Sequence, residues 1–116
     1  MTPSQVRYDT MTPDEMVVVN EDGQVVEAKD GYEPTSELPT HNKILEEISG
    51  VTSVIHDHSK YANVLATLYS EIPVMHTEAA LFLGGTINVG DYVLPGGEAM
   101  AAEVVDNLMT TPAMVL

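Results

Sequence analysis

The sequence predicts a single layered domain of the α/β or α+β class. Two observations carry this prediction. Short β-branched runs alternate along the chain with segments of helical periodicity, and 44% of the 116 residues are hydrophobic. A chain of this length can bury one core, and no internal repeat divides it.

The first half of the chain predicts a hairpin and then a helix. The β-branched runs at 16–19 and 24–27 flank a polar turn that contains Gly23. A helix is expected to start at Ser36 as N-cap, with Glu37 in its first turn, and to end at Gly50. Its apolar positions follow helical spacing: His41, Ile44, Leu45 and Ile48.

The second half predicts several further short elements. A strand over 51–58 is followed by a helix over 60–69, with Ser59 as N-cap and Tyr61, Val64, Leu65 and Leu68 facing inward. Residues 79–83 are ambiguous between helix and strand. A helix is expected over 98–108, with Met100, Ala101, Val104 and Leu108 inward. The remaining apolar runs read as short extended segments: 72–75, 86–89, 91–95 and 113–116.

The pair His56 and His58 is the most informative feature of the sequence. In a strand, residues i and i+2 point to the same face about 6.5–7 Å apart along it, so both imidazoles can approach one metal ion while Asp57 faces away. The alternative is two surface histidines at a strand end. Because the chain has no cysteine, a metal would be held by histidine and carboxylate.

Glu37 is the carboxylate expected beside this pair. A short turn joins the helix to the histidine strand, so the two should pack antiparallel and bring Glu37 near the imidazoles. The free N–H groups of the helix start favour an anion such as phosphate. A metal, a carboxylate and an anion site together suit proton abstraction next to a carbonyl in a phosphorylated substrate. The alternative for Glu37 is an acid that only complements the helix dipole.

The charge balance excludes one class of partner. With 18 acidic and 4 basic residues the chain carries −14, whereas nucleic-acid binding needs a basic face. Dispersed acids on an ordinary core are typical of a high-salt cytoplasm, and an ordinary acidic protein is the alternative. No run approaches a membrane span and Met1-Thr2-Pro3 does not begin a signal peptide, so a cytoplasmic protein is expected.

Several linked motifs resemble the class II aldolase and ribulose-phosphate 4-epimerase family. They cover nearly all of the chain: Met11-Thr12-Pro13-Asp14, Pro34-Thr35-Ser36-Glu37-Leu38-Pro39-Thr40-His41, Ser53-Val54-Ile55-His56-Asp57-His58-Ser59, Glu71-Ile72-Pro73, Glu78-Ala79-Ala80 and Tyr92-Val93-Leu94-Pro95-Gly96. The resemblance implies a three-layer α/β/α fold with a largely antiparallel central sheet, here incomplete, and usually a homotetramer.

The resemblance also implies a reaction and a role for each site residue. The reaction is zinc-dependent cleavage of a ketose 1-phosphate to dihydroxyacetone phosphate and an aldehyde, with Mn²⁺ or another divalent ion as alternatives to Zn²⁺. His56 and His58 match the family's zinc ligands, and Glu37 matches the acid/base. The hydroxyl residues that match those holding the phosphate of the small phosphorylated sugar are Ser4, Thr35 and Ser36. Epimerase relatives carry Asp at the Glu37 position, so the longer side chain favours an aldolase.

The departures from the family pattern are specific. Gln5 stands where the family has Gly, and Thr77 where some members have a catalytic tyrosine. The third zinc histidine would fall just beyond Leu116, so the chain is expected to be the central part of a family domain, truncated at both ends. A non-catalytic fragment or interaction module is therefore the alternative. A cupin also uses an H-x-H pair, but the helical periodicities argue against an all-β barrel.

Overall fold

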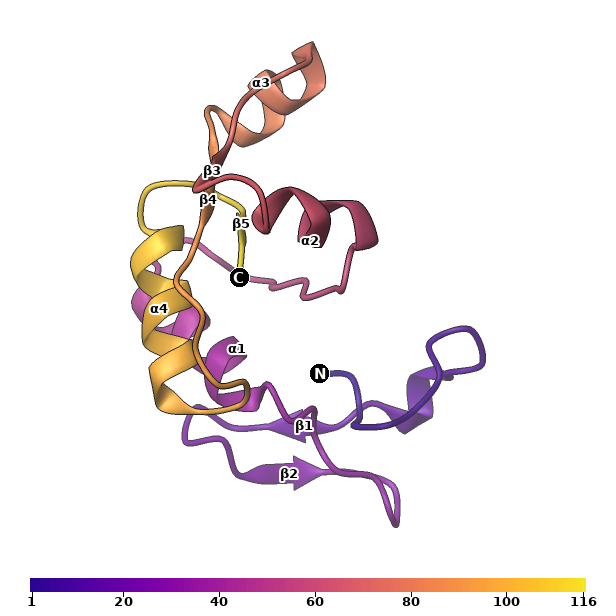
Figure 1. Ribbon diagram of the computed structural model, residues 1–116. Helices are drawn as coiled ribbons and strands as arrows, with labels where there is room; N and C mark the ends of the chain where they lie inside the picture. Colours follow the sequence, from indigo (N-terminus) through magenta and orange to yellow (C-terminus); the bar gives the residue numbers. More distant parts are fainter.

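Two helices packed side by side form the centre of the structure. In the computed structural model, which describes residues 1–116, α1 (Leu38–Glu47) packs against α4 (Glu98–Leu108) (Figure 1). Ile44 from α1 and three residues of α4 form the buried cluster between them, Met100, Val104 and Val105. Partly buried apolar side chains surround this cluster: Ile48, Val51, Val54, Val93, Leu108 and Met114.

The helix predictions hold best for α4, whose bounds coincide with the predicted 98–108. The helix α1 begins at Leu38, with Glu37 rather than Ser36 at the N-cap, and ends at Glu47. The prediction of a Ser36 cap was wrong because Thr35 organises the turn. Its carbonyl accepts the Leu38 amide at 3.1 Å, and its hydroxyl accepts the Glu37 amide at 3.3 Å.

The N-terminal hairpin is confirmed, with shorter strands than predicted. After the 3-10 turn Pro13–Glu15, β1 (Val18–Val19) pairs antiparallel with β2 (Val25–Glu27). The turn between them is closed by an Asn20 amide to Gln24 carbonyl bond of 2.9 Å, and Gly23 takes the expected positive φ of 76°.

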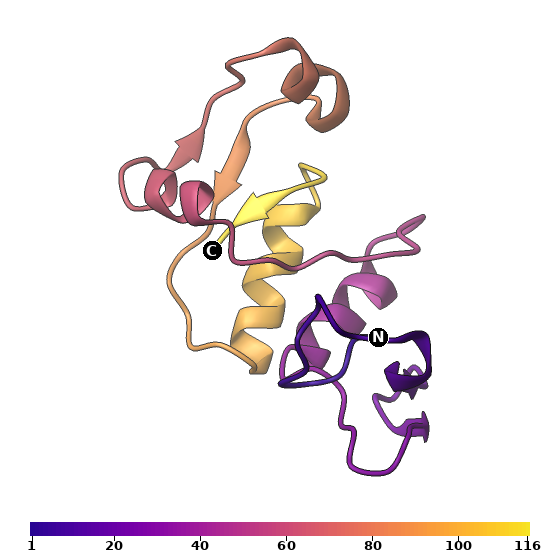
Figure 2. The same cartoon turned by 90° about the vertical axis from the view of Figure 1, so that its right-hand side faces the viewer.

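A second sheet lies at the other end of the molecule (Figure 2). Its central strand β4 (Ile87–Val89) pairs antiparallel with β3 (Glu71–Ile72) and parallel with β5 (Met114–Val115). Helix α2 (Lys60–Ala66) precedes β3 in the chain, and helix α3 (Thr77–Leu83) lies between β3 and β4. The mixed α/β class is confirmed and no barrel is present, but the strands form two small sheets rather than one central sheet.

The structure differs from the predicted strand over 51–58 and from the predicted helix over 60–69. Residues 51–58 run extended but pair with no strand, and no backbone group of residues 52–58 makes a backbone hydrogen bond. Residues 91–95 are likewise unpaired. The helix predicted to reach residue 69 ends at Ala66, and three side chains predicted to face inward are exposed, Tyr61, Val64 and Leu68. Residues 79–83 resolve as helix α3, which Gly84 ends at a φ of 73°.

Most of the negative charge has no basic partner. Only three acidic side chains lie within salt-bridge distance of Lys or Arg, in the pairs Arg7–Asp9, Lys29–Asp14 and Lys43–Glu47. All six of these side chains are partly exposed to solvent, so each pair stabilises the fold little. No helix combines the length and the apolar character needed to cross a membrane.

We predict that the buried cluster between α1 and α4 controls stability. Ile44 is 3% exposed, so Ile44→Ala should lower the free energy of unfolding by about 2–5 kcal/mol through the cavity it leaves. Its neighbour Leu45 is 44% exposed, and Leu45→Ala is the matched control, expected to change it by about 0.5 kcal/mol or less. Urea unfolding followed by circular dichroism measures both; equal losses in the two variants would contradict this packing.

We also predict that stability rises with salt. Fourteen net negative charges repel one another, and raising the ionic strength from 0.01 to 1 M shortens the Debye length from about 30 to about 3 Å. The melting temperature should therefore increase with KCl. A variant with Glu21→Gln, Asp22→Asn and Glu27→Gln, three exposed acids outside the ion pairs, should respond less. A melting temperature that stays flat or falls with KCl would refute the high-salt interpretation.

Candidate functional site

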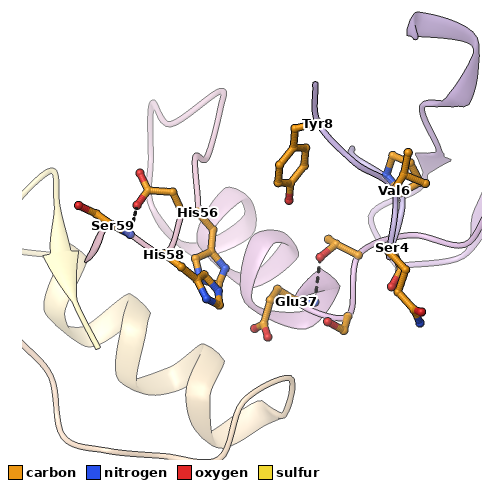
Figure 3. Close-up of a pocket in the computed structure, with 12 residues that line it drawn as sticks. Ser4, Val6, Tyr8, Glu37, His56, His58 and Ser59 are labelled. Carbon is orange, nitrogen blue, oxygen red and sulfur yellow. Dashed lines mark hydrogen bonds between the residues drawn. The ribbon is translucent and has the colours of Figure 1, made fainter. Parts of the chain in front are cut away.

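The predicted site residues converge on one pocket of about 900 Å³ (Figure 3). It lies between the N-terminal segment, the loop before α1 and the extended histidine segment. Its lining includes all six residues singled out from the sequence: Ser4, Thr35, Ser36, Glu37, His56 and His58. The three parts of the sequence that were interpreted separately therefore share one cavity.

Backbone pairing brings the hydroxyl residues together. Pro3 and Pro34 form an antiparallel bridge, and two flanking bonds extend it. The Ser4 amide donates to the Glu33 carbonyl at 2.8 Å, and the Thr35 amide donates to the Thr2 carbonyl at 3.2 Å. Ser4 is thereby held beside the loop that carries Thr35 and Ser36, although these segments are far apart in the sequence.

A glycine turn before α4 packs against the loop that carries Thr35 and Ser36. Gly96 has a φ of 79°, and a Cβ atom there would lie 3.3 Å from the Ser36 carbonyl oxygen. A larger residue at this position would be strained and would press on the site loop. The close approach ties the start of α4 to the wall of the pocket.

The two histidines face the same way, as the i, i+2 spacing predicts. Their ring centroids lie 5.1 Å apart with the planes inclined by 27°. Asp57 turns away from them, and its Oδ1 accepts a hydrogen bond of 2.7 Å from the Ser59 amide. The geometry of the pair thus survives without the strand pairing that was expected to impose it.

Glu37 brings an unpaired carboxylate oxygen to the same pocket. Its Oε2 atom is buried and has no hydrogen-bond partner. Glu37, His56 and His58 all line this pocket (Figure 3). An unsatisfied buried polar atom costs about 1–3 kcal/mol, so an oxygen left in this state marks a place where a ligand or a proton is expected.

His41 lies next to the pair without lining this pocket. Its ring centroid is 6.4 Å from that of His56, and burial lowers the pKa of the His41 imidazole below its ordinary value. The nearby His56 lowers this pKa further, while Glu37 acts in the opposite direction. Burial therefore favours the neutral form of the His41 imidazole, whose pKa lies below its ordinary value.

The donor set fits part of a metal site. Two imidazoles and one carboxylate are the nitrogen and oxygen ligands that Zn²⁺ and similar ions accept. The structure holds no group of three or more His, Cys, Asp or Glu side chains arranged to bind an ion. His56 and His58 offer two imidazoles to the pocket, and Glu37, which lines the same pocket, has one buried carboxylate oxygen without a hydrogen-bond partner.

The lining of the pocket also includes residues to which the sequence assigned no role in catalysis or binding, among them Tyr8 and Gln5. Tyr8 stands on the wall formed by the N-terminal segment, across from the histidines (Figure 3). Gln5 lies beside Ser4 and is the single non-glycine residue with positive φ, 59°. The family pattern has Gly at this position, and a left-handed backbone conformation is one that Gly adopts without the steric cost of a side chain. His76 does not line the pocket; its Nδ1 accepts the Ala79 amide at 3.3 Å and caps α3.

Comparisons with known proteins agree with the fold and the motifs. The model of the family described as Class II Aldolase and Adducin N-terminal domain matches residues 1–116. The L-ribulose-5-phosphate 4-epimerase UlaF of Salmonella paratyphi C is 40% identical over 85 residues, which cover 73% of this chain and 36% of that protein. The corresponding protein of Salmonella typhi is 39% identical over the same shares.

A solved structure of an L-fuculose 1-phosphate aldolase superposes with a TM-score of 0.89 at 27% sequence identity. The match covers 99% of this chain and 53% of that one. The chain belongs to the class II aldolase and adducin N-terminal domain family, whose relatives named here act on sugar phosphates. It spans about a third of the length of the curated relatives it matches.

Proposed function

We propose that this site belongs to a metal-dependent sugar-phosphate lyase that cleaves a ketose 1-phosphate, such as fuculose 1-phosphate, to dihydroxyacetone phosphate and an aldehyde. The observation that supports it is the shared pocket, in which a buried, unpaired Glu37 oxygen lies with two imidazoles and a set of hydroxyl residues. Membership of the class II aldolase family and the aldolase structural neighbour support the same proposal.

The hydroxyl residues are proposed to hold the phosphate. Ser4 and Ser36 make no side-chain hydrogen bond within the protein, so both hydroxyls are available to a ligand. The Thr35 oxygen accepts the Glu37 amide, which leaves the Thr35 hydroxyl proton free to donate outward. The positive end of the α1 dipole adds to the attraction for an anion.

Glu37 is proposed as the acid/base. In the condensation direction its carboxylate takes the proton from the α-carbon of dihydroxyacetone phosphate, and in cleavage it returns that proton. A buried oxygen with no competing donor is suited to this transfer because it need not first break a hydrogen bond. A divalent ion on His56 and His58, Zn²⁺ or alternatively Mn²⁺, would supply Lewis-acid polarisation of the substrate carbonyl.

A second candidate is a 4-epimerase of a pentulose phosphate. The observation that favours it is the 40% identity to L-ribulose-5-phosphate 4-epimerase. The glutamate at position 37 favours the lyase, since the epimerase pattern has the shorter aspartate. Supplying both substrates separates the two activities, because only the lyase releases dihydroxyacetone phosphate.

We predict that His56 and His58 form a weak metal half-site. A catalytic zinc site uses three protein ligands, so two imidazoles should bind weakly. Replacing both by Ala should weaken Zn²⁺ binding by more than about 10-fold, measured by isothermal titration calorimetry. His76→Ala is the matched control, because His76 is exposed and outside the pocket. Unchanged zinc binding in the double variant would remove the half-site.

We predict that catalysis needs Glu37 together with parts of the fold that this chain does not contain. The 116-residue chain alone should show no measurable cleavage, because the structure contains no three-ligand metal group. A chimera in which residues 1–116 replace the matching half of the fuculose 1-phosphate aldolase should cleave fuculose 1-phosphate. In that chimera Glu37→Gln should keep the metal and lose about 10²–10⁴-fold in kcat.

The control for this experiment is Glu33→Gln, since Glu33 is exposed and outside the pocket. Exchange of the α-proton of dihydroxyacetone phosphate in D₂O, followed by NMR, isolates the step assigned to Glu37. Full exchange in the Glu37→Gln chimera would assign the base to another group. An inactive but folded and metal-loaded chimera would favour the non-catalytic alternative.

A further inference from the structure

Gln5 is held in a backbone conformation that few side chains adopt. Its φ is 59°, and every other residue of the chain with a positive φ is a glycine. The left-handed region crowds the Cβ atom against the backbone, so glycine adopts it freely, asparagine and aspartate sometimes, and glutamine seldom. Such conformations persist only where the surrounding structure holds them, and they cluster at functional sites. A glutamine in this conformation therefore indicates a role for its side chain.

Backbone pairing fixes the chain directly before Gln5. Pro3 is buried and bridges Pro34, and the hydrogen bond of the Ser4 amide extends this pairing. Successive residues of a straight strand point to opposite faces, so they do not all face one cavity. The left-handed conformation of Gln5 breaks this alternation, and residues 3–6 in succession line the pocket.

The carboxamide of Gln5 forms no hydrogen bond within the protein. Over residues 1–12 the side chains that form hydrogen bonds are those of Arg7, Asp9, Thr10 and Thr12. Gln5 therefore brings free N–H donors and a free carbonyl oxygen to the lining of the pocket. The hydroxyl of the preceding residue is also free, so two adjacent side chains are available to the same ligand.

The donors on this wall of the pocket suit a phosphate group. Ser4 stands on the N-terminal segment, across the pocket from His56 and His58 (Figure 3). Serine hydroxyls and glutamine amides both donate to phosphate oxygens. A hydrogen bond to an ionised group is about twice as strong as one between neutral groups. A phosphate bound beside Ser4 would therefore be stabilised further by an N–H group of Gln5.

We propose that Gln5 is a specificity-determining residue of this pocket, and that its side-chain N–H group donates to the phosphate oxygens of the substrate next to Ser4. The assignment rests on the proposed function, since it takes a sugar phosphate as the ligand. Gln5 would favour phosphorylated over non-phosphorylated sugars through a neutral donor. The opposite role is a side chain that only narrows the pocket and hinders the phosphate.

Titration of the 116-residue chain with inorganic phosphate, followed by phosphorus NMR, tests the proposal without turnover. Gln5→Met nearly keeps the length of the side chain but removes its N–H donors. It should weaken phosphate binding about 10-fold or more, as expected for the loss of a hydrogen bond to a charged group. Gln24→Met is the matched control and should bind phosphate like the wild type, because Gln24 is the other glutamine of the chain and lies outside the pocket.

A second variant separates a donor from an obstacle. Gln5→Gly removes the side chain and adopts a positive φ without strain, so it keeps the test valid if the methionine variant folds poorly. It should also bind phosphate more weakly than the wild type. Tighter binding by Gln5→Gly, or unchanged binding by Gln5→Met, would show that the side chain only narrows the pocket and would overturn the proposal. A wild-type chain that binds no phosphate would overturn it as well.

The chimera described above distinguishes this role of Gln5 from the proposed reaction. In an active chimera Gln5→Met should raise KM for fuculose 1-phosphate about 10-fold or more and change kcat little, because a contact made equally in the ground and transition states affects binding alone. A lower kcat with unchanged KM would overturn the role in binding. A chimera without lyase activity whose phosphate binding still depends on Gln5 would support this role and refute the proposed reaction.

Discussion

The packing of α1 against α4 is the contact on which the rest of the structure depends. Only nine of the 116 residues are buried, and four of them form the cluster between these two helices. Helix α1 begins at the site loop and α4 begins at the glycine turn that touches it. The apolar contact that forms the core therefore also fixes the positions of the two segments next to the loop that carries Thr35, Ser36 and Glu37, namely the start of α1 and the glycine turn before α4.

The site is assembled by backbone pairing rather than by a sheet. The Pro3–Pro34 bridge and its two flanking hydrogen bonds hold Ser4 next to Thr35. The histidine segment reaches the pocket through apolar contacts of Val51 and Val54 with the core cluster, while its backbone groups stay unpaired. Few interactions hold the histidine segment in place. A third ligand or a substrate would therefore shift this segment more easily than the rest of the site, and so change the distance between the imidazoles and Glu37.

The sequence alone determined the class, the hairpin and α4, because these follow from local periodicity and turn chemistry. It also indicated the candidate residues of the site, partly from motif spacing and partly from the resemblance of several motifs to a known family. The hairpin turn requires a positive φ at Gly23 whatever surrounds the hairpin. The i, i+2 spacing of His56 and His58 puts both rings on one side of any extended segment. Tertiary structure decided what depends on partners distant in sequence. Residues 52–58 have strand-like composition but no neighbouring strand, so they form no sheet. Tyr61 and Leu68 follow helical periodicity but have nothing to cover them. The sequence already singled out Glu37 as the acid/base, but only the fold removes its Oε2 atom from water without giving it a hydrogen-bond donor, a condition that no local pattern specifies.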